Sequence, residues 1–236
     1  MNEWSNERKA VPMIELRRLG KNLDTPAGPM RVLDAIDLRV ERGEFVSIMG
    51  PSGAGKTSLL SLLGLLDADF DGDYRLDGVS VAGLRDSARK QLAARQIGFV
   101  FQHYHLLDEL SVAKNIELPL EYRGLAKAER RQRVDEVLSE FGLEGKRGWY
   151  PRMLSGGQQQ LVAVARAVAA KPSLLLADEP TGALHSSQGV MIMDLLQRLN
   201  RAGTTIVQVT HHPGYAERAG RVLQMHDGRL QQAVDN

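Results

Sequence analysis

The stretch GPSGAGKT at residues 50–57 constrains the fold of this chain more than any other feature. It has the spacing G-x-x-x-x-G-K-[ST] and lies between a strand-like run, EFVSIM, and a helix-like run, SLLSLLGLL. In that setting the glycines let the main chain curl until several N–H groups point at one anion. The positive N-terminal end of the following helix strengthens the effect. A glycine-rich turn without a ligand is the alternative, and the flanking runs argue against it.

The side chains of this loop predict a nucleotide phosphate site. Lys56 can reach the β- and γ-phosphates of a nucleotide, and the hydroxyl of Thr57 can ligate Mg²⁺. The candidate nucleotide-binding residues of the loop are Gly50, Pro51, Ser52, Gly53, Ala54, Gly55, Lys56, Thr57 and Ser58.

Two acids end a second apolar run, SLLLADEP, at residues 173–180. An acid at the end of a buried strand is costly unless a cation meets it. We expect Asp178 to face the Mg²⁺ shell and Glu179 to lie beside the γ-phosphate, where it would orient or deprotonate water. A core strand followed by an acidic turn is the alternative, and the upstream phosphate loop makes it the weaker one.

Two more polar residues end apolar runs. Gln102 ends GFVFQ and is a neutral group that can contact Mg²⁺ or water, whereas His211 follows TTIVQVT and can contact a γ-phosphate. Each signal is weak alone, because polar residues at strand ends are commonly just solvated. In an open parallel sheet, however, ligands bind at the carboxyl ends of the strands, which favours a role for His211 at the phosphate site.

The order of the apolar runs predicts an α/β fold, because short runs suited to buried parallel strands alternate with helix-like runs. Residues 104–160 interrupt this alternation with helical stretches at 111–123 and 126–142. We expect a polar tail over residues 1–12 and a single domain over residues 13–236, with a helical subdomain at about 104–160.

Composition argues against other classes of protein. The net charge of +1 shows no sign of nucleic-acid binding, and the absence of cysteine excludes disulfides and thiolate metal sites. No apolar run approaches the ~20 residues that a membrane-spanning helix needs. A role at a membrane would therefore require a partner that holds the chain there.

The stretch LSGGQQQ at residues 154–160, here called the signature loop, contains no acid, base or strong nucleophile. Ser155 and Gln158, spaced S-x-x-Q before an apolar run, form a capping-box pattern. Gly156 and Gly157 leave the amides of this helix start open to a second anion. Either one chain binds two phosphates, or the signature loop serves a nucleotide bound by a neighbour.

Taken in order, these motifs resemble those of ABC-type ATPase subunits. The resemblance covers about residues 13–232 and rests on GPSGAGKT, Gln102, LSGGQ, LLLADEP, TGALHSS and His211. LSGGQ is the signature of that class. Two longer stretches resemble the sequences of one branch of this class, the lipoprotein-releasing, macrolide-exporter and cell-division-associated ATPases. They are GFVFQHYHLLDELSVAKNIELPL and ADEPTGAL. The resemblance implies a P-loop NTPase with a RecA-like core, an antiparallel β subdomain and a helical insert.

The resemblance also implies a function. Two copies would form a homodimer that holds ATP and Mg²⁺ between the phosphate loop of one subunit and the signature loop of the other. The helical insert, roughly 102–122, would dock on an integral membrane permease subunit at the cytoplasmic face of the membrane. ATP hydrolysis would then drive export, extraction or mechanotransmission. The implied roles are catalytic for Glu179, His211 and Gln102, metal-binding for Thr57, Gln102 and Asp178, and nucleotide-binding in trans for Ser155, Gly156, Gly157 and Gln158.

Several positions depart from the family pattern. His185 stands where the loop after the acids usually has Asp, Leu161 where Arg is usual, and His212 where Asp is usual. No aromatic residue is available near the first strand to stack on adenine, which leaves Leu19 or Leu23 for apolar contact. These departures motivate a second hypothesis, a nucleotide-gated regulatory or scaffold module with low turnover. A DNA-repair or translation ATPase is a third, and this chain lacks its usual insertions.

Overall fold

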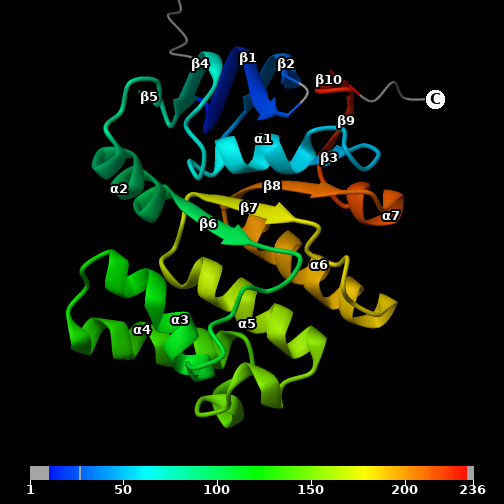
Figure 1. Ribbon diagram of the computed structural model, residues 1–236. Helices are drawn as coiled ribbons and strands as arrows, with labels where there is room; N and C mark the ends of the chain where they lie inside the picture. The colour runs from blue at the N-terminus through cyan, green and yellow to red at the C-terminus, as the bar shows by residue number, and fades with distance from the viewer. Residues whose placement is uncertain (1–10, 27, 233–236) are drawn as a thin grey trace, which may run out of the picture.

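The computed structural model describes residues 11–26 and 28–232 (Figure 1). Most of the predicted tail, residues 1–10, lies outside this part of the chain. The elements in chain order are β1 (Ile14–Thr25), β2 (Gly28–Val40), β3 (Phe45–Met49), α1 (Lys56–Leu63), β4 (Asp71–Leu76), β5 (Val79–Ser80), α2 (Asp86–Gln96), β6 (Ile97–Val100), α3 (Val112–Tyr122), α4 (Lys127–Glu140), η1 (Glu144–Lys146), η2 (Pro151–Met153), α5 (Gly156–Ala169), β7 (Leu174–Asp178), α6 (Ser186–Arg201), β8 (Thr205–Thr210), α7 (Pro213–Ala216), β9 (Arg221–His226) and β10 (Arg229–Gln232).

A six-stranded sheet crosses the middle of the molecule in the order β10-β9-β3-β8-β7-β6. The five strands from β9 to β6 are parallel, and β10 pairs with β9 in the antiparallel sense. Every residue of β8 is buried, and so are the first four of β3 and of β7. That is why these strands read as nearly unbroken apolar runs, since both faces of the sheet are covered.

A four-stranded antiparallel sheet, β2-β1-β4-β5, lies on one side of the parallel sheet, with α1 between the two (Figure 1). One apolar cluster fills this layer. It joins Leu16 of the antiparallel sheet, Leu59 of α1 and Ile48 of β3. The phosphate loop and its helix are thus held between two sheets.

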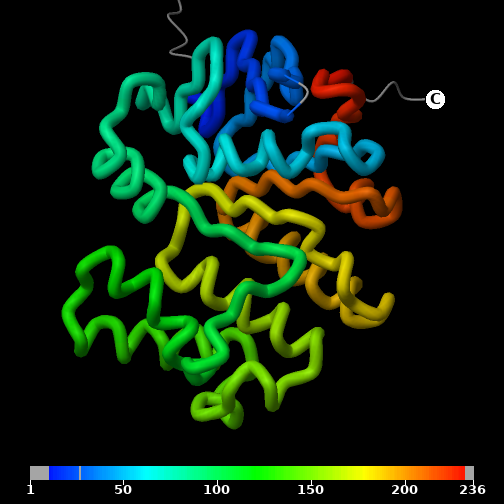
Figure 2. The backbone as a smooth tube through the Cα atoms, in the orientation of Figure 1, coloured from blue at the N-terminus to red at the C-terminus, as the bar shows by residue number. Residues whose placement is uncertain are grey.

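Helices α3, α4, α5 and α6 cover the opposite face of the parallel sheet, as the backbone trace also shows (Figure 2). A second apolar cluster joins Ile116 of α3, Val137 of α4, Val164 of α5 and Leu175 of β7. The predicted helical subdomain at about 104–160 contains α3, α4 and the start of α5, and it shares this cluster with the sheet.

The strand-like and helix-like runs named from the sequence all contribute to strands or helices of the structure. Helix α2 was not expected, because it has no buried residue and therefore no apolar stripe. Within the described residues, no helix is long and apolar enough to cross a membrane.

Candidate active site

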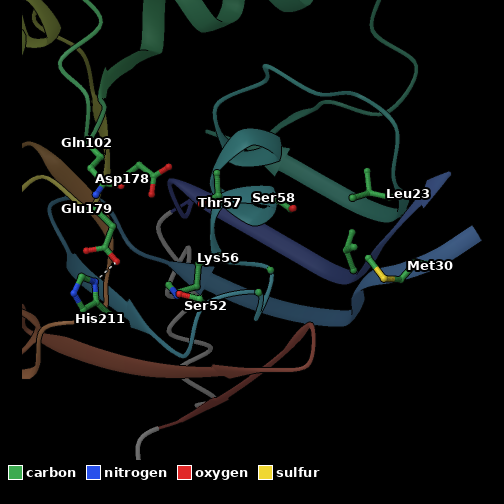
Figure 3. Close-up of a pocket in the computed structure, with 13 residues that line it drawn as sticks. Leu23, Met30, Ser52, Lys56, Thr57, Ser58, Gln102, Asp178, Glu179 and His211 are labelled. Atoms are coloured by element: carbon green, nitrogen blue, oxygen red, sulfur yellow. Dashed lines mark hydrogen bonds and ion pairs between the residues drawn. The ribbon is translucent and has the colours of Figure 1, made fainter. Parts of the chain in front are cut away.

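The carboxyl ends of four parallel strands bring the predicted functional residues together. The phosphate loop follows β3, Gln102 follows β6, Asp178 and Glu179 end β7, and His211 follows β8. They enclose a cavity of about 520 Å³ (Figure 3). Its lining comprises Leu23, Met30, Val32, Ser52, Gly53, Gly55, Lys56, Thr57, Ser58, Gln102, Asp178, Glu179 and His211.

The phosphate loop has the curled backbone that the motif predicted. Gly53 has a φ of 82° and Gly55 a φ of 100°, in the left-handed region that strains residues with a Cβ. A Cβ on Gly55 would also lie 2.7 Å from the carbonyl oxygen of Val32. Gly55 is the N-cap of α1 and has no side chain to cap it, so the first amides of that helix remain available to an anion.

Lys56 is held inside the loop that it follows. Its Nζ donates to the carbonyl oxygen of Gly50 at 2.7 Å and to that of Pro51 at 2.9 Å, and the residue is only 8% exposed. Gly50 and Pro51 therefore contribute carbonyl groups rather than cavity lining. Ala54 does not line the cavity either, because its side chain is buried in the core and its amide donates to Pro51. These three candidates shape the loop.

Asp178 lines the cavity and has a raised pKa. Burial is the main cause, and the neighbouring charge of Glu179 adds to it, while a hydrogen bond from Thr57 and the charge of Lys56 oppose the rise. A cation bound next to this carboxylate would therefore stabilise its charged form. Together with the hydroxyl of Thr57 and the amide of Gln102, the carboxylate forms an oxygen donor set of the kind that Mg²⁺ prefers.

We expect Asp178→Asn to stabilise the chain without nucleotide at pH 7 to 8. Because the pKa of Asp178 is higher in the folded than in the unfolded chain, its contribution to stability is present at low pH and is lost as pH rises through the folded pKa. Removing a poorly paired carboxylate should raise stability by about 1 kcal/mol, or about 2–4 °C in Tm. Thermal melts from pH 4 to 8 test this, and a lower Tm for the variant at every pH would contradict it.

Glu179 is held by a hydrogen bond to His211 and by a strained backbone. Its Oε1 lies 2.9 Å from Nδ1 of His211, an interaction drawn as a dashed line in Figure 3. Its other oxygen, Oε2, is buried and has no hydrogen-bond donor among the described residues. The backbone is strained here, with a φ of 44°, and its amide donates to the carbonyl of Val209 at 3.0 Å. Strain held by neighbouring structure is typical of functional sites, and a buried carboxylate oxygen without a donor is a second unsatisfied feature at this position.

The end of the cavity farthest from Glu179 is apolar. Leu23 and Met30 lie there, on the far side of Lys56 and Thr57 (Figure 3), and Val32 also lines the cavity. Of the two leucines considered for contact with adenine, Leu23 is therefore in place. Leu19 was a wrong candidate, because it is fully buried in the core of the antiparallel sheet. Met30 and Val32 were not predicted as cavity residues, although their spacing of two places both on one face of β2.

The signature loop forms the predicted helix start, but it does so away from this cavity. Ser155 is the N-cap of α5, its hydroxyl accepts from the amide of Gln158 at 3.4 Å, and Gln158 Oε1 accepts from the amide of Ser155 at 3.0 Å. None of the four residues Ser155, Gly156, Gly157 and Gln158 is among the described residues that line the cavity. Deeper in the loop, buried Gln160 donates to the carbonyl of Pro180 at 2.7 Å, which links α5 to the turn after Glu179.

The fold and the site together define a P-loop ATPase. A curled phosphate loop, two acids and two further polar groups converge at the carboxyl edge of a parallel sheet, and a helical layer carries the signature loop. A family model described as ABC transporter matches residues 33–182, more than half of the chain. The chain belongs to the ABC transporter family.

Individual relatives agree with this assignment. "Macrolide export ATP-binding/permease protein MacB 1/2" of Paracoccus denitrificans (strain Pd 1222) is 46% identical over 93% of this chain, which spans only 33% of that protein. "Uncharacterized ABC transporter ATP-binding protein YknY" of Bacillus subtilis (strain 168) is 44% identical over 92% of this chain and 95% of its own length.

A solved structure is also similar, the dimeric post-hydrolysis state of the ATP-binding cassette MJ0796 bound to ADP and Pi. It has a TM-score of 0.86 and 38% identity, covering 95% of this chain and 100% of that chain. The predicted family and fold class are thereby confirmed, and the chain is an ABC-type ATPase subunit.

Proposed function

We propose that two copies of this chain close head to tail on two ATP molecules, and that hydrolysis reopens them. The observation that carries this proposal is the position of the signature loop. It forms a helix start with exposed Ser155 and two glycines, yet none of its residues lines the cavity of its own chain. Such a surface suits the γ-phosphate of a nucleotide bound by a second copy. The dimeric state of the similar ATP-binding cassette supports the arrangement.

Within each site, the residues divide the chemistry. Lys56 and the loop amides would hold the phosphates, and Thr57, Gln102 and Asp178 would hold Mg²⁺. When bound, Mg²⁺ would neutralise charge on the phosphate oxygens. Glu179 takes the proton of the attacking water, and His211, hydrogen-bonded to it, keeps its carboxylate oriented.

Mixing two defective variants tests whether the signature loop acts in trans. Lys56→Ala removes the phosphate lysine, and Ser155→Glu places a negative charge where the partner's phosphate would lie, so each variant alone should be inactive. In a mixed dimer, one site combines the intact phosphate loop of one chain with the intact signature loop of the other. Mixing should therefore restore up to about a quarter of wild-type activity, if pairing is random. A mixture that stays inactive would mean that the signature loop acts within its own chain.

The membrane partner would dock in an apolar groove of about 700 Å³ between the parallel sheet and α3. It is lined largely by apolar side chains, and Tyr122 at its rim is 81% exposed. The groove falls beside the insert at 102–122 that the resemblance assigned to docking. The relatives named ATP-binding/permease proteins, of which this chain spans a third, support a permease as the occupant at the cytoplasmic face of the membrane. The residues that define the groove are Ile97, Phe99, Phe101, Leu118, Pro119 and Tyr122.

One observation favours the second candidate function, a regulatory module with low turnover. His185 is the N-cap of α6, and its side chain forms no capping hydrogen bond. The aspartate usual in the family would cap this helix. His185 is also exposed, in the loop that the resemblance places at the contact between subunits.

We expect His185→Asp to stabilise the chain by about 1 kcal/mol, because an aspartate N-cap satisfies a free amide at the start of α6. If the chain is a low-turnover module because of this histidine, kcat should also rise severalfold. Thermal melts and steady-state ATPase assays separate the two effects. A higher Tm with unchanged kcat would argue against the low-turnover hypothesis, and Ser187→Asp, within the first turn of the same helix, controls for added charge.

A further inference from the structure

The residues from Gln102 to His105, here called the connecting segment, lie between the phosphate cavity and the apolar groove. Gln102 lines the cavity with Asp178 and Glu179. His105 lines the groove on the other side, and its ring lies 4.5 Å from that of Phe101, another groove residue. A few residues of chain thus separate the two sites.

The connecting segment has a strained backbone. Tyr104 has a φ of 59° and His105 a φ of 46°, so two consecutive residues with side chains adopt the left-handed conformation. Such a conformation persists only where neighbouring groups hold the backbone in place.

Arg166 of α5 supplies the main restraint. Its Nη2 donates to the carbonyl oxygen of Tyr104 at 2.8 Å, and its Nη1 donates to the carbonyl oxygen of His105. The guanidinium forms no ion pair within the described part of the chain, and burial lowers its pKa. Arg166 is half-buried, and both of its printed acceptors are main-chain oxygens of this one turn, so its guanidinium is used to hold the turn.

A second contact fixes the same segment near the start of α5. A Cβ built on Gly156 would lie 2.8 Å from the hydroxyl oxygen of Tyr104, so the tyrosine ring ends against the first glycine of the signature loop. The connecting segment therefore touches α5 twice, at Gly156 and at Arg166. At its other end, the amide nitrogen of Gln102 is packed 3.0 Å from the position a Cβ on Gly182 would occupy, in the turn after Glu179.

We propose that Arg166 and Tyr104 are positioning residues that clamp the connecting segment to the signature helix and thereby place Gln102 at the phosphate cavity. Neither residue lines the phosphate cavity of its own chain, so each acts on that cavity through Gln102. This inference rests on the proposed function only in requiring that Gln102 take part in hydrolysis. It adds that the position of Gln102 is set from α5, the helix that presents the signature loop to a partner.

The effect of Arg166→Gln on ATPase kinetics in two backgrounds tests the inference. In the wild-type background we expect kcat to fall about tenfold, with the KM for ATP unchanged within twofold, because the phosphate loop is untouched. In a Gln102→Ala background the same substitution should change kcat by less than twofold, since the group being positioned is absent. Arg166→Lys, whose ammonium can donate to both carbonyls, should restore kcat to within about threefold of wild type.

Arg133→Gln is the matched control. Arg133 on α4 also donates to main-chain carbonyl oxygens, those of Val168 and Ala169 at the end of α5, and none of its printed hydrogen bonds goes to the connecting segment. The Arg133→Gln variant should have a lower Tm than wild type and an unchanged kcat. If Arg166→Gln fails to fold, Arg166→Met, which keeps most of the side-chain stem and removes the donors, replaces it in both backgrounds with the same expectation. Equal losses of kcat in both backgrounds would overturn the inference and leave the proposed function standing. If Gln102→Ala itself leaves kcat unchanged, the role proposed for Gln102 is wrong and the inference falls with it.

Discussion

Replacing Glu179 by glutamine should lower kcat about 10²- to 10⁴-fold, the range that loss of a positioned general base typically costs. The substitution is nearly isosteric, and the amide can still hydrogen-bond to Nδ1 of His211, which lies 2.9 Å from the carboxylate. Binding of ATP should change little, because Lys56 and the loop amides are untouched. The variant should therefore bind ATP and retain it, which a steady-state assay and a binding titration together would show.

Light scattering on Glu179→Gln then reports on the dimer. With Mg-ATP the variant should be a dimer, because blocked hydrolysis leaves the nucleotide in place between two chains, and with ADP it should be a monomer. A monomer in both conditions, with ATP bound, would contradict closure by this chain alone. Unchanged ATPase activity would contradict the role of Glu179. Glu140→Gln, an exposed acid at the end of α4, is the control for loss of one carboxylate.

Replacing Lys56 by alanine should weaken ATP binding about 100-fold or more. Hydrogen bonds to a charged group contribute about 1.5–3 kcal/mol each, and losing two of them to phosphate oxygens corresponds to at least that factor. The structure adds a second reason. Lys56 Nζ now satisfies the carbonyl oxygens of Gly50 and Pro51, so its removal also leaves the loop without an internal support.

Calorimetric titration with Mg-ATP measures this loss, and a thermal melt with and without nucleotide checks it independently. Lys127→Ala removes an exposed lysine at the start of α4 and should leave affinity within twofold of wild type. Wild-type affinity in Lys56→Ala would mean that this loop is not the nucleotide site. A lower Tm without nucleotide would report the support that the lysine gives to the loop.

The parts of the site that lie within one motif were predictable from the sequence. The spacing of Gly50, Gly55, Lys56 and Thr57 dictates a curled loop, because glycine alone tolerates the φ of 100° found at Gly55. The meeting of Gln102, Asp178 and His211 was also predictable. Each follows a buried strand-like run, and the carboxyl ends of parallel strands share one edge of the sheet.

Residues that act through packing were not predictable in this way. Met30 and Val32 lie on a strand of the antiparallel sheet, and they reach the cavity only because that sheet lies over α1. Leu19 reads like Leu23 in the sequence, yet the first is in the core and the second at the cavity. The register of the bulged β1 strand decides between them.

By itself, then, the sequence determined the class of fold, the phosphate loop, the order of the acids and the helix start at Ser155, since each depends on local backbone rules and hydrophobic periodicity. Only the tertiary structure decided that the signature loop lies outside its own chain's cavity, and that Arg166 holds the carbonyls of Tyr104 and His105. Those contacts join residues about 60 positions apart along the chain, and no local spacing rule specifies how such distant segments meet.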